Sequence, residues 1–137
     1  MAGKAKSPLS IAKQVLDIEL AGLKAVRAQL DGQFTSAVEA MVEALGRRNK
    51  LVIVGIGKSG NIGQKIAATF NSTGATSVLL DAANALHGDI GLLDDGDVVL
   101  ALSYSGESDE LLNLIGAIKK FPVQIIALTG APRSGLA

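Results

Sequence analysis

Cysteine is absent from the 137-residue sequence, and aromatic residues make up only 3% of it. Without cysteine, the chain has no disulfide framework and no thiolate metal site. Charge of one sign is also lacking, because 13 lysine and arginine residues balance 13 aspartate and glutamate residues. This balance argues against a nucleic-acid or membrane surface, so we expect neither of these partners.

Long apolar runs are missing as well, since no stretch approaches the roughly 18 residues of a membrane span. The lysines near the start, Lys4 and Lys6, are followed by no apolar segment of the signal-peptide kind. We therefore expect a cytoplasmic protein. Apolar residues make up 48% of the chain, and with many glycines and few aromatics they favour a compact α/β domain over a β-sandwich.

The stretch Leu51–Gly63 predicts a buried strand, a glycine turn and a helix. It begins with four apolar residues, three of them β-branched, and glycines at positions 55, 57 and 60 follow with G-x-G-x-x-G spacing. Glycine lets the backbone turn sharply and approach a ligand closely. The free N–H groups at the start of the next helix attract anions, above all phosphate.

Apolar runs and helical periodicity alternate along the rest of the chain. This alternation predicts an α/β fold with a parallel sheet and right-handed crossovers, preceded by two helices, in a single domain over residues 1–137. We expect helices at about Pro8–Leu30, Thr35–Leu45, Ser59–Phe70 and Ser108–Lys120, and strands at Leu51–Val54, Ser77–Leu80, Val98–Leu102 and Val123–Leu128.

Three details of this pattern concern its boundaries. Asp31-Gly32 is interpreted as the stop of the first helix, and the basic residues Arg47, Arg48 and Lys50 as a solvated turn. Four strands with an open edge are fewer than usual, so we expect a fifth strand in the natural protein.

The glycine turn allows two nucleotide-binding interpretations. A P-loop needs G-x-x-x-x-G-K-[ST], but its first glycine would fall on Val52, so we reject it. A dinucleotide fingerprint remains open, because Asp81 ends the second strand about 20 residues on, where a ribose-binding acid belongs.

A second polar loop follows the third strand. Ser103, Ser105 and Ser108 surround Gly106 and place hydroxyl and N–H groups at another helix N-terminus, which is an anion nest suited to a phosphate monoester. The simpler alternative is an ordinary strand end with an N-cap. Because the carboxyl ends of parallel strands share one edge, we expect this serine loop to lie beside the glycine turn.

Two further residues are candidates for acid–base chemistry. His87, the only histidine, is either a loop residue with a backbone partner or a group for proton transfer or sugar binding. Glu110 lies in the first turn of the helix after the serine loop, as a helix-dipole partner or as a carboxylate aimed at the ligand. Glu107 is the alternative candidate for a carboxylate aimed at the ligand, whereas Asp109 is expected to be a solvated or capping acid.

Four motifs occur in this order: Gly55–Gly63 (Gly-Ile-Gly-Lys-Ser-Gly-Asn-Ile-Gly), Leu86–Asp89 (Leu-His-Gly-Asp), Ser103–Gly106 (Ser-Tyr-Ser-Gly) and Leu128–Gly130 (Leu-Thr-Gly). At these residues the sequence resembles the sugar isomerase (SIS) domain of arabinose-5-phosphate isomerases. The resemblance covers nearly the whole chain. It implies a Rossmann-like three-layer sandwich around a parallel sheet, and a homo-oligomer, dimer or tetramer, with sites at subunit interfaces.

The resemblance also implies interconversion of D-arabinose 5-phosphate and D-ribulose 5-phosphate, which supplies Kdo synthesis for lipopolysaccharide or capsule. It assigns catalysis to Lys58 and Glu110 and substrate binding to Gly74, Ala75, His87 and the serine loop. Ser59 is a further substrate-binding candidate, because it lies inside the glycine turn. A base and a charge partner for an oxyanion suffice for aldose–ketose isomerisation, so no metal or other cofactor is expected.

The sequence departs from the family pattern in three respects. A further catalytic Glu and His fall beyond residue 137, as does a pair of CBS domains, and Asp81 stands where some members carry a metal-binding His. We therefore expect an incomplete catalytic domain that is weakly active or inactive alone. The alternative is a non-catalytic sugar-phosphate-binding module, since SIS domains also serve as ligand sensors.

Overall fold

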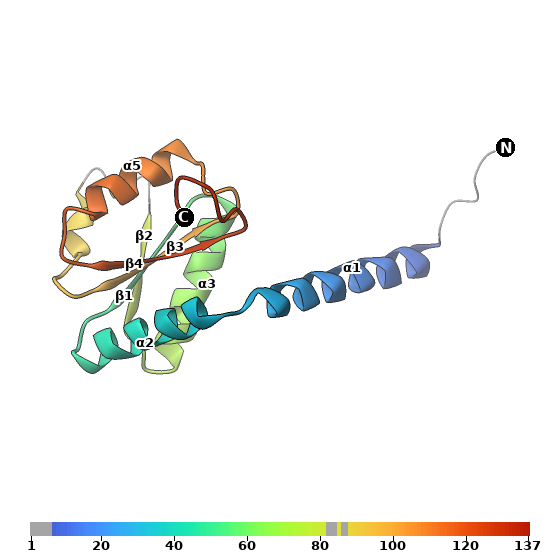
Figure 1. Cartoon of the computed structure of the whole chain (residues 1–137), viewed down its shortest axis with the longest axis horizontal. Coiled ribbons are helices and arrows are strands. Elements are labelled where there is room, and N and C mark those ends of the chain that lie inside the picture. Colours follow the sequence, from blue (N-terminus) through green and yellow to red (C-terminus); the bar gives the residue numbers. More distant parts are fainter. Residues whose placement is uncertain (1–6, 82–84, 86–87) are drawn as a thin grey trace. The chain divides into compact units, whose positions relative to one another are not determined.

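The computed structural model describes residues 7–81, 85 and 88–137. Two compact units make up the chain, residues 1–36 and residues 37–137. The first contains helix α1 (Pro8–Gln29), and helix α2 (Gly32–Gly46) begins in the first and ends in the second. The second unit holds the parallel sheet and its covering helices (Figure 1).

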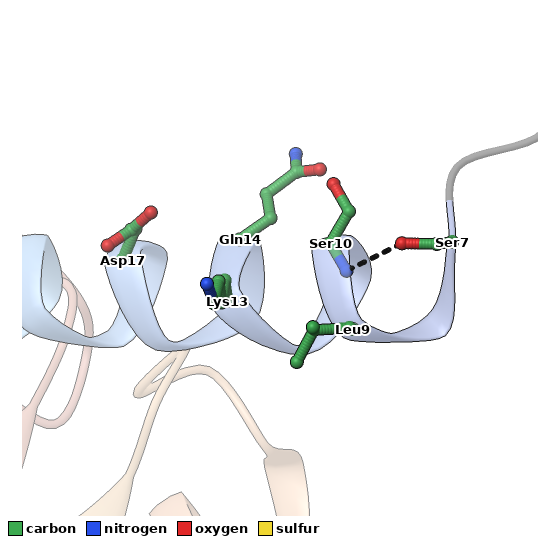
Figure 2. Close-up of a pocket in the computed structure, with 6 residues that line it drawn as sticks. All are labelled: Ser7, Leu9, Ser10, Lys13, Gln14 and Asp17. Carbon is green, nitrogen blue, oxygen red and sulfur yellow. Dashed lines mark hydrogen bonds between the residues drawn. The ribbon is translucent and has the colours of Figure 1, made fainter.

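Helix α1 begins as the sequence predicts. The Ser7 hydroxyl accepts a hydrogen bond from the backbone N–H of Ser10 at 3.2 Å, and Pro8 occupies the first turn. Figure 2 shows this cap beside a shallow hollow whose lining residues, from Ser7 to Asp17, all belong to this one end of the helix. The hollow is therefore a surface feature of a single helix and not an enclosed site.

Helix α2 begins three residues earlier than predicted. The carboxylate of Asp31 accepts a hydrogen bond from the backbone N–H of Gln33 at 2.9 Å, in the manner of a helix N-cap. The interpretation of Asp31-Gly32 as a stop alone was therefore incomplete, because Asp31 also starts the next helix.

Within the residues that the structure describes, the sheet has four parallel strands in the order β2-β1-β3-β4. The elements of the second unit after α2 are β1 (Leu51–Gly55), α3 (Lys58–Ser72), β2 (Ser77–Asp81), the 3₁₀ helix η1 (Asp89–Leu92), β3 (Val98–Ser103), α5 (Asp109–Ile118) and β4 (Gln124–Thr129). The predicted strands and helices are confirmed, and no end differs from its predicted position by more than three residues. Strands β2 and β4 are the two edge strands of this sheet.

Alternate residues of the strands form two apolar layers, so α5 and α3 lie on opposite sides of the sheet (Figure 1). On one side Val52, Val54, Val99 and Ala101 pack with the apolar face of α5. On the other side Ile53 and Leu102 pack with Ala67 of α3, and Leu51 and Val98 pack with Ala44 of α2. The three-layer α/β fold is thus confirmed.

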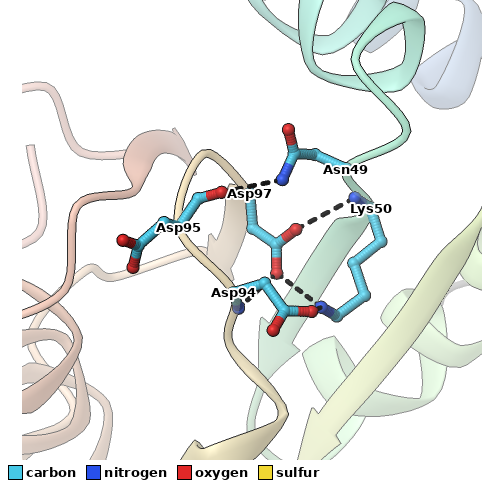
Figure 3. Close-up of polar contacts among 5 residues, drawn as sticks. All are labelled: Asn49, Lys50, Asp94, Asp95 and Asp97. Carbon is cyan, nitrogen blue, oxygen red and sulfur yellow. Dashed lines mark hydrogen bonds and ion pairs between the residues drawn. The ribbon is translucent and has the colours of Figure 1, made fainter.

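A polar cluster joins the strands at the amino edge of the sheet (Figure 3). Asp97 is fully buried, and its carboxylate accepts hydrogen bonds from the backbone N–H groups of Lys50 at 3.0 Å and Asp94 at 2.9 Å. The Lys50 ammonium lies 2.7 Å from Asp97 and 2.6 Å from Asp94. The interpretation of Lys50 as a solvated residue was therefore wrong, because this side chain is only 16% exposed and ion-paired.

Candidate functional site

The glycine turn and the serine loop lie side by side at the carboxyl edge of the sheet. Strands β1 and β3 are hydrogen-bonded neighbours, and Gly55 at the end of β1 pairs with Leu102 near the end of β3. The two loops therefore begin next to each other. The strand order also places this point where the crossovers change direction, from β1 to β2 on one side and to β3 on the other. Open α/β sheets bind ligands at such a point.

The glycine turn brings the end of β1 into direct backbone contact with the start of α3. A Cβ atom added to Gly60 would lie 2.9 Å from the carbonyl oxygen of Gly55, and one added to Gly55 would lie 2.8 Å from the carbonyl carbon of Ser59. Gly57 adopts a positive φ of 54° and precedes α3 directly. Helix α3 therefore begins with the exposed Lys58 and half-buried Ser59 at the carboxyl edge, where its positive end favours an anion.

A cleft of about 460 Å³ lies beside this turn. Its lining combines the turn with polar side chains of α3 and the end of β2: Gly55, Ile56, Gly57, Gly60, Asn61, Gln64, Leu79 and Asp81. Sequence reasoning missed Asn61 and Gln64, although their spacing of three residues puts them on the same face of the helix. Amide and carboxylate groups in a cleft are suited to binding the hydroxyls of a sugar.

The serine loop uses its hydroxyls in different ways. Ser103 is buried, and its Oγ accepts a hydrogen bond from the backbone N–H of Gly106 at 3.0 Å. Ser105 is exposed, and its Oγ accepts from the N–H of Glu107 at 3.3 Å. Ser108 occupies the N-cap position of α5 without a side-chain capping bond. Ser108 thus occupies the position that the capping alternative predicts, but its hydroxyl does not form the capping hydrogen bond.

The two candidate carboxylates beside the serine loop differ in their contacts. Glu107 Oε1 accepts a hydrogen bond from the backbone N–H of Gly135 at 3.1 Å, and Leu136 donates its own N–H to the carbonyl of Gly106 at 3.1 Å. Leu136 is also buried in the core. Glu107 therefore holds residues 130–137 against the loop, which leaves the exposed Glu110, in the first turn of α5, as the candidate for chemistry.

Two predicted substrate-binding residues lie at the opposite edge. Gly74 and Ala75 follow α3 and precede β2, and the next residue, Thr76, accepts a hydrogen bond from Leu51 at the start of β1. Because α3 runs back across the sheet, these residues are about 16 Å, one five-residue strand, from the carboxyl edge. Within one chain they do not meet Lys58. The predicted contact at His87 lies outside the described residues.

In residues 7–81, 85 and 88–137, no three His, Cys, Asp or Glu side chains gather where they could share a metal ion. Among the helices that the structure describes, none combines the length and apolar character needed to cross a membrane.

The sequence profile of the SIS domain family matches residues 44–137, which is more than half of the chain. The chain belongs to the SIS domain family. The matched region contains the whole sheet, the glycine turn and the serine loop.

Two curated relatives extend the match to the leading helices. Arabinose 5-phosphate isomerase KdsD of Salmonella typhi is 45% identical over 125 residues, covering 91% of this chain and 37% of that protein. KdsD of Pseudomonas aeruginosa is 40% identical over 126 residues, covering 92% and 38%. The chain thus spans a little over a third of the length of these relatives.

A solved structure shows the same fold. The Escherichia coli CFT073 protein c3406 in complex with A5P superposes with a TM-score of 0.79 at 32% identity, covering 96% of this chain and 70% of that one. The SIS domain of this chain is thus similar in sequence to two proteins named arabinose 5-phosphate isomerase and in fold to a protein solved with A5P.

Proposed function

We propose that this SIS domain binds a pentose 5-phosphate at the carboxyl edge of its sheet and belongs to an isomerase of D-arabinose 5-phosphate and D-ribulose 5-phosphate. The observation that carries the proposal is the pairing of β1 with β3, which puts two anion-binding loops next to each other. The names of the KdsD relatives and the A5P bound in the c3406 structure support the choice of ligand.

In this proposal the serine loop holds the phosphate through Ser103, Ser105, Ser108 and backbone N–H groups, and Ser59 adds a hydroxyl from the glycine turn. Isomerisation moves a proton between adjacent carbons through an enediol. We assign the proton transfer to Glu110 and the stabilisation of the developing oxyanion to the Lys58 ammonium. Neither step requires a metal or a redox cofactor.

Gly74, Ala75 and His87 complete the proposed substrate-binding set. Since Gly74 and Ala75 lie at the amino edge of their own sheet, they reach the substrate of another copy only. The proposal therefore includes a homo-oligomer, a dimer or a tetramer. It also places the protein in the cytoplasm, where the reaction would supply Kdo synthesis for lipopolysaccharide or capsule.

Ligand binding is tested by thermal unfolding with ribulose 5-phosphate, arabinose 5-phosphate or NAD. We expect either sugar phosphate at 100 times its dissociation constant to stabilise the chain by about 2.7 kcal/mol, which raises the midpoint by several degrees. NAD should leave the midpoint unchanged. Stabilisation by NAD alone would instead favour the dinucleotide interpretation, with Asp81 as its ribose-binding acid.

Lys58 should contribute directly to this binding. Lys58→Met removes an exposed ammonium from the start of α3, and we expect about tenfold weaker binding of ribulose 5-phosphate by calorimetry. Lys65→Met is the matched control, because Lys65 is an exposed lysine two turns along the same helix and away from the edge. Equal affinities in the two variants would contradict the role of Lys58.

An isomerase and a sensor module differ in turnover. A coupled assay that follows ribulose 5-phosphate during incubation with arabinose 5-phosphate tests this directly. Turnover that falls with Glu110→Gln would support the isomerase. Tight binding without turnover would fit both the non-catalytic sugar-phosphate-binding module and a catalytic domain that is incomplete over these 137 residues, so the same assay on the full-length protein separates those two.

A further inference from the structure

One face of helix α3 lines the cleft beside the glycine turn. The residues that α3 supplies to this lining are Gly60, Asn61 and Gln64. Gly60 and Asn61 lie four and three residues before Gln64, so all three share one face of the helix. Because Gly60 has no side chain, Asn61 and Gln64 provide the polar side chains on this face. The end of β2 adds Leu79 and Asp81 to the same cleft.

The amide groups of Asn61 and Gln64 are not used by the fold. Both residues are exposed, and within the described part of the chain neither side chain has a hydrogen-bond partner. Asn71, further along α3, shows the contrast, since its amide donates to the carbonyl of Ser77 and accepts from the Ser77 N–H, each at 2.8 Å. An amide donates and accepts hydrogen bonds, as a sugar hydroxyl does. The two amides in the cleft therefore suit a ligand with hydroxyl groups.

The distance from the serine loop to this cleft matches the length of a pentose 5-phosphate. The serine loop follows β3, the cleft reaches the end of β2, and β1 lies between these strands. Neighbouring strands are about 4.8 Å apart, so the two places are separated by about 10 Å. An open-chain pentose 5-phosphate extends about 8 Å from phosphorus to C1, because each of its six bonds advances the chain by about 1.3 Å. A phosphate in the serine loop therefore lets the C1–C2 end of the sugar reach the cleft.

The chemistry of the proposed reaction requires a contact at that end. Arabinose 5-phosphate and ribose 5-phosphate differ only in the configuration at C2, and an enediol can be protonated on either face of this carbon. The serine loop cannot distinguish the two sugars, since it is proposed to hold the phosphate at the other end of the chain. A site that hydrogen-bonds a substrate hydroxyl discriminates against ligands in which this hydroxyl is missing or misplaced.

We propose that the amides of Asn61 and Gln64 bind the C2 hydroxyl of the sugar and select the arabino over the ribo configuration. This inference rests on the proposed function and deepens it, because it names the residues that set the specificity of the site.

The first test compares three ligands by calorimetry. 2-Deoxyribose 5-phosphate isolates the contact, because it lacks the C2 hydroxyl and keeps the phosphate and the other carbons. We expect the wild type to bind arabinose 5-phosphate at least tenfold more tightly than ribose 5-phosphate or 2-deoxyribose 5-phosphate. Asn61→Leu and Gln64→Met replace each amide by an apolar group that a helix accepts. Each variant should bind arabinose 5-phosphate about fivefold more weakly and change the affinity for 2-deoxyribose 5-phosphate less than twofold.

Lys65→Met is the matched control for these variants. It places the same methionine one residue further along α3, at an exposed position outside the lining of the cleft. Any effect of its lost charge should be equal for arabinose 5-phosphate and 2-deoxyribose 5-phosphate. Equal losses for these two ligands in Asn61→Leu and Gln64→Met, or no loss, would overturn the inference and leave the sugar-phosphate site standing. A wild type that binds none of the three ligands would overturn the proposed function and this inference with it.

A second test observes the amides themselves. The side-chain NH₂ signals of Asn61 and Gln64 in a ¹⁵N NMR spectrum are assigned by their loss in the two variants. They should shift when arabinose 5-phosphate is added and stay in place with inorganic phosphate, which would occupy the serine loop alone. Equal shifts with both ligands would show a response to phosphate and overturn the assignment to the C2 hydroxyl.

Discussion

Asp97→Asn is expected to lower the free energy of unfolding by about 3 kcal/mol or more, in the range measured when one partner of a buried ion pair is removed. Both oxygens of the Asp97 carboxylate accept hydrogen bonds, one from the Lys50 N–H and the other from the Asp94 N–H. An amide keeps the shape but turns its NH₂ group toward one of these donors. It also leaves the Lys50 ammonium without its buried counter-charge.

Asp95→Asn is the matched control in the same turn. The Asp95 carbonyl, and not its carboxylate, accepts the hydrogen bond from the Asn49 amide, so the control should change stability by less than about 0.5 kcal/mol (Figure 3). Urea unfolding at neutral pH measures both variants. Similar losses in the two would show that the turn is not held by Asp97.

The pH dependence checks the same cluster even if Asp97→Asn folds poorly at neutral pH. Burial alone would raise the pKa of Asp97, but the hydrogen bonds from Lys50 and Asp94 outweigh it and hold the pKa below its ordinary value. The stabilisation is therefore complete above the unfolded-state pKa of about 4 and is lost as the pH falls through the lower folded-state pKa. The stability of the wild type should approach that of Asp97→Asn in acid.

Lys50 shows the converse behaviour at high pH. Burial by itself would lower the pKa of this ammonium, but hydrogen bonds to Asp94 and Asp97 outweigh that effect and raise it. Its contribution is complete below the unfolded-state pKa of about 10.4 and is lost as the pH rises through the higher folded-state pKa. The difference between wild type and Asp97→Asn should thus be nearly constant from about pH 5 to 9.

Gly60→Ala is expected to cost about 2–3 kcal/mol of unfolding free energy and to weaken ribulose 5-phosphate binding at least tenfold. The added methyl group would lie 2.9 Å from the carbonyl oxygen of Gly55, which is closer than real Cβ contacts. Both atoms belong to backbone, so relief requires α3 to move away from β1. That movement displaces the helix end that is proposed to face the ligand.

Gly116→Ala controls for the chemistry of the substitution. Gly116 lies inside α5, and a Cβ atom added there meets nothing within 4 Å. Alanine is about 1 kcal/mol more favourable than glycine within a helix, so this variant should be as stable as the wild type or more so. Denaturant unfolding and calorimetry with ribulose 5-phosphate measure both effects. A Gly60→Ala chain that behaves like Gly116→Ala would show that the close contact is easily relieved.

The sequence predicted the sheet well because its strands are continuous apolar runs that leave little choice of structure. Asp31 shows the limit, since one residue can end a helix and begin the next, and periodicity reports only the apolar positions of each. Lys50 shows another. Its partners Asp94 and Asp97 lie 44 and 47 residues away along the chain, and nothing in the local pattern distinguishes a buried ion pair from a solvated turn.

The candidate site was predicted in part. Parallel strands bring their carboxyl ends together, so the placement of the glycine turn beside the serine loop followed from the alternation of elements and is confirmed. The contact between Glu107 and Gly135 could not be read from the sequence, because it depends on how residues 130–137 fold back. Gly74 and Ala75 lie at the amino edge of the sheet, because α3 returns the chain from the carboxyl edge to the amino edge before β2 begins.

The direction shared by all four strands has an evolutionary consequence. Residues that fasten the strands together and residues that would meet a ligand occur at opposite ends of the same short strands. A lineage can therefore exchange Asn61, Gln64 or the side chains of the serine loop to favour a different ligand while Lys50 and Asp97 keep the protein folded. The same division offers an engineer two regions that can be diversified independently, one for selectivity and the other for heat resistance.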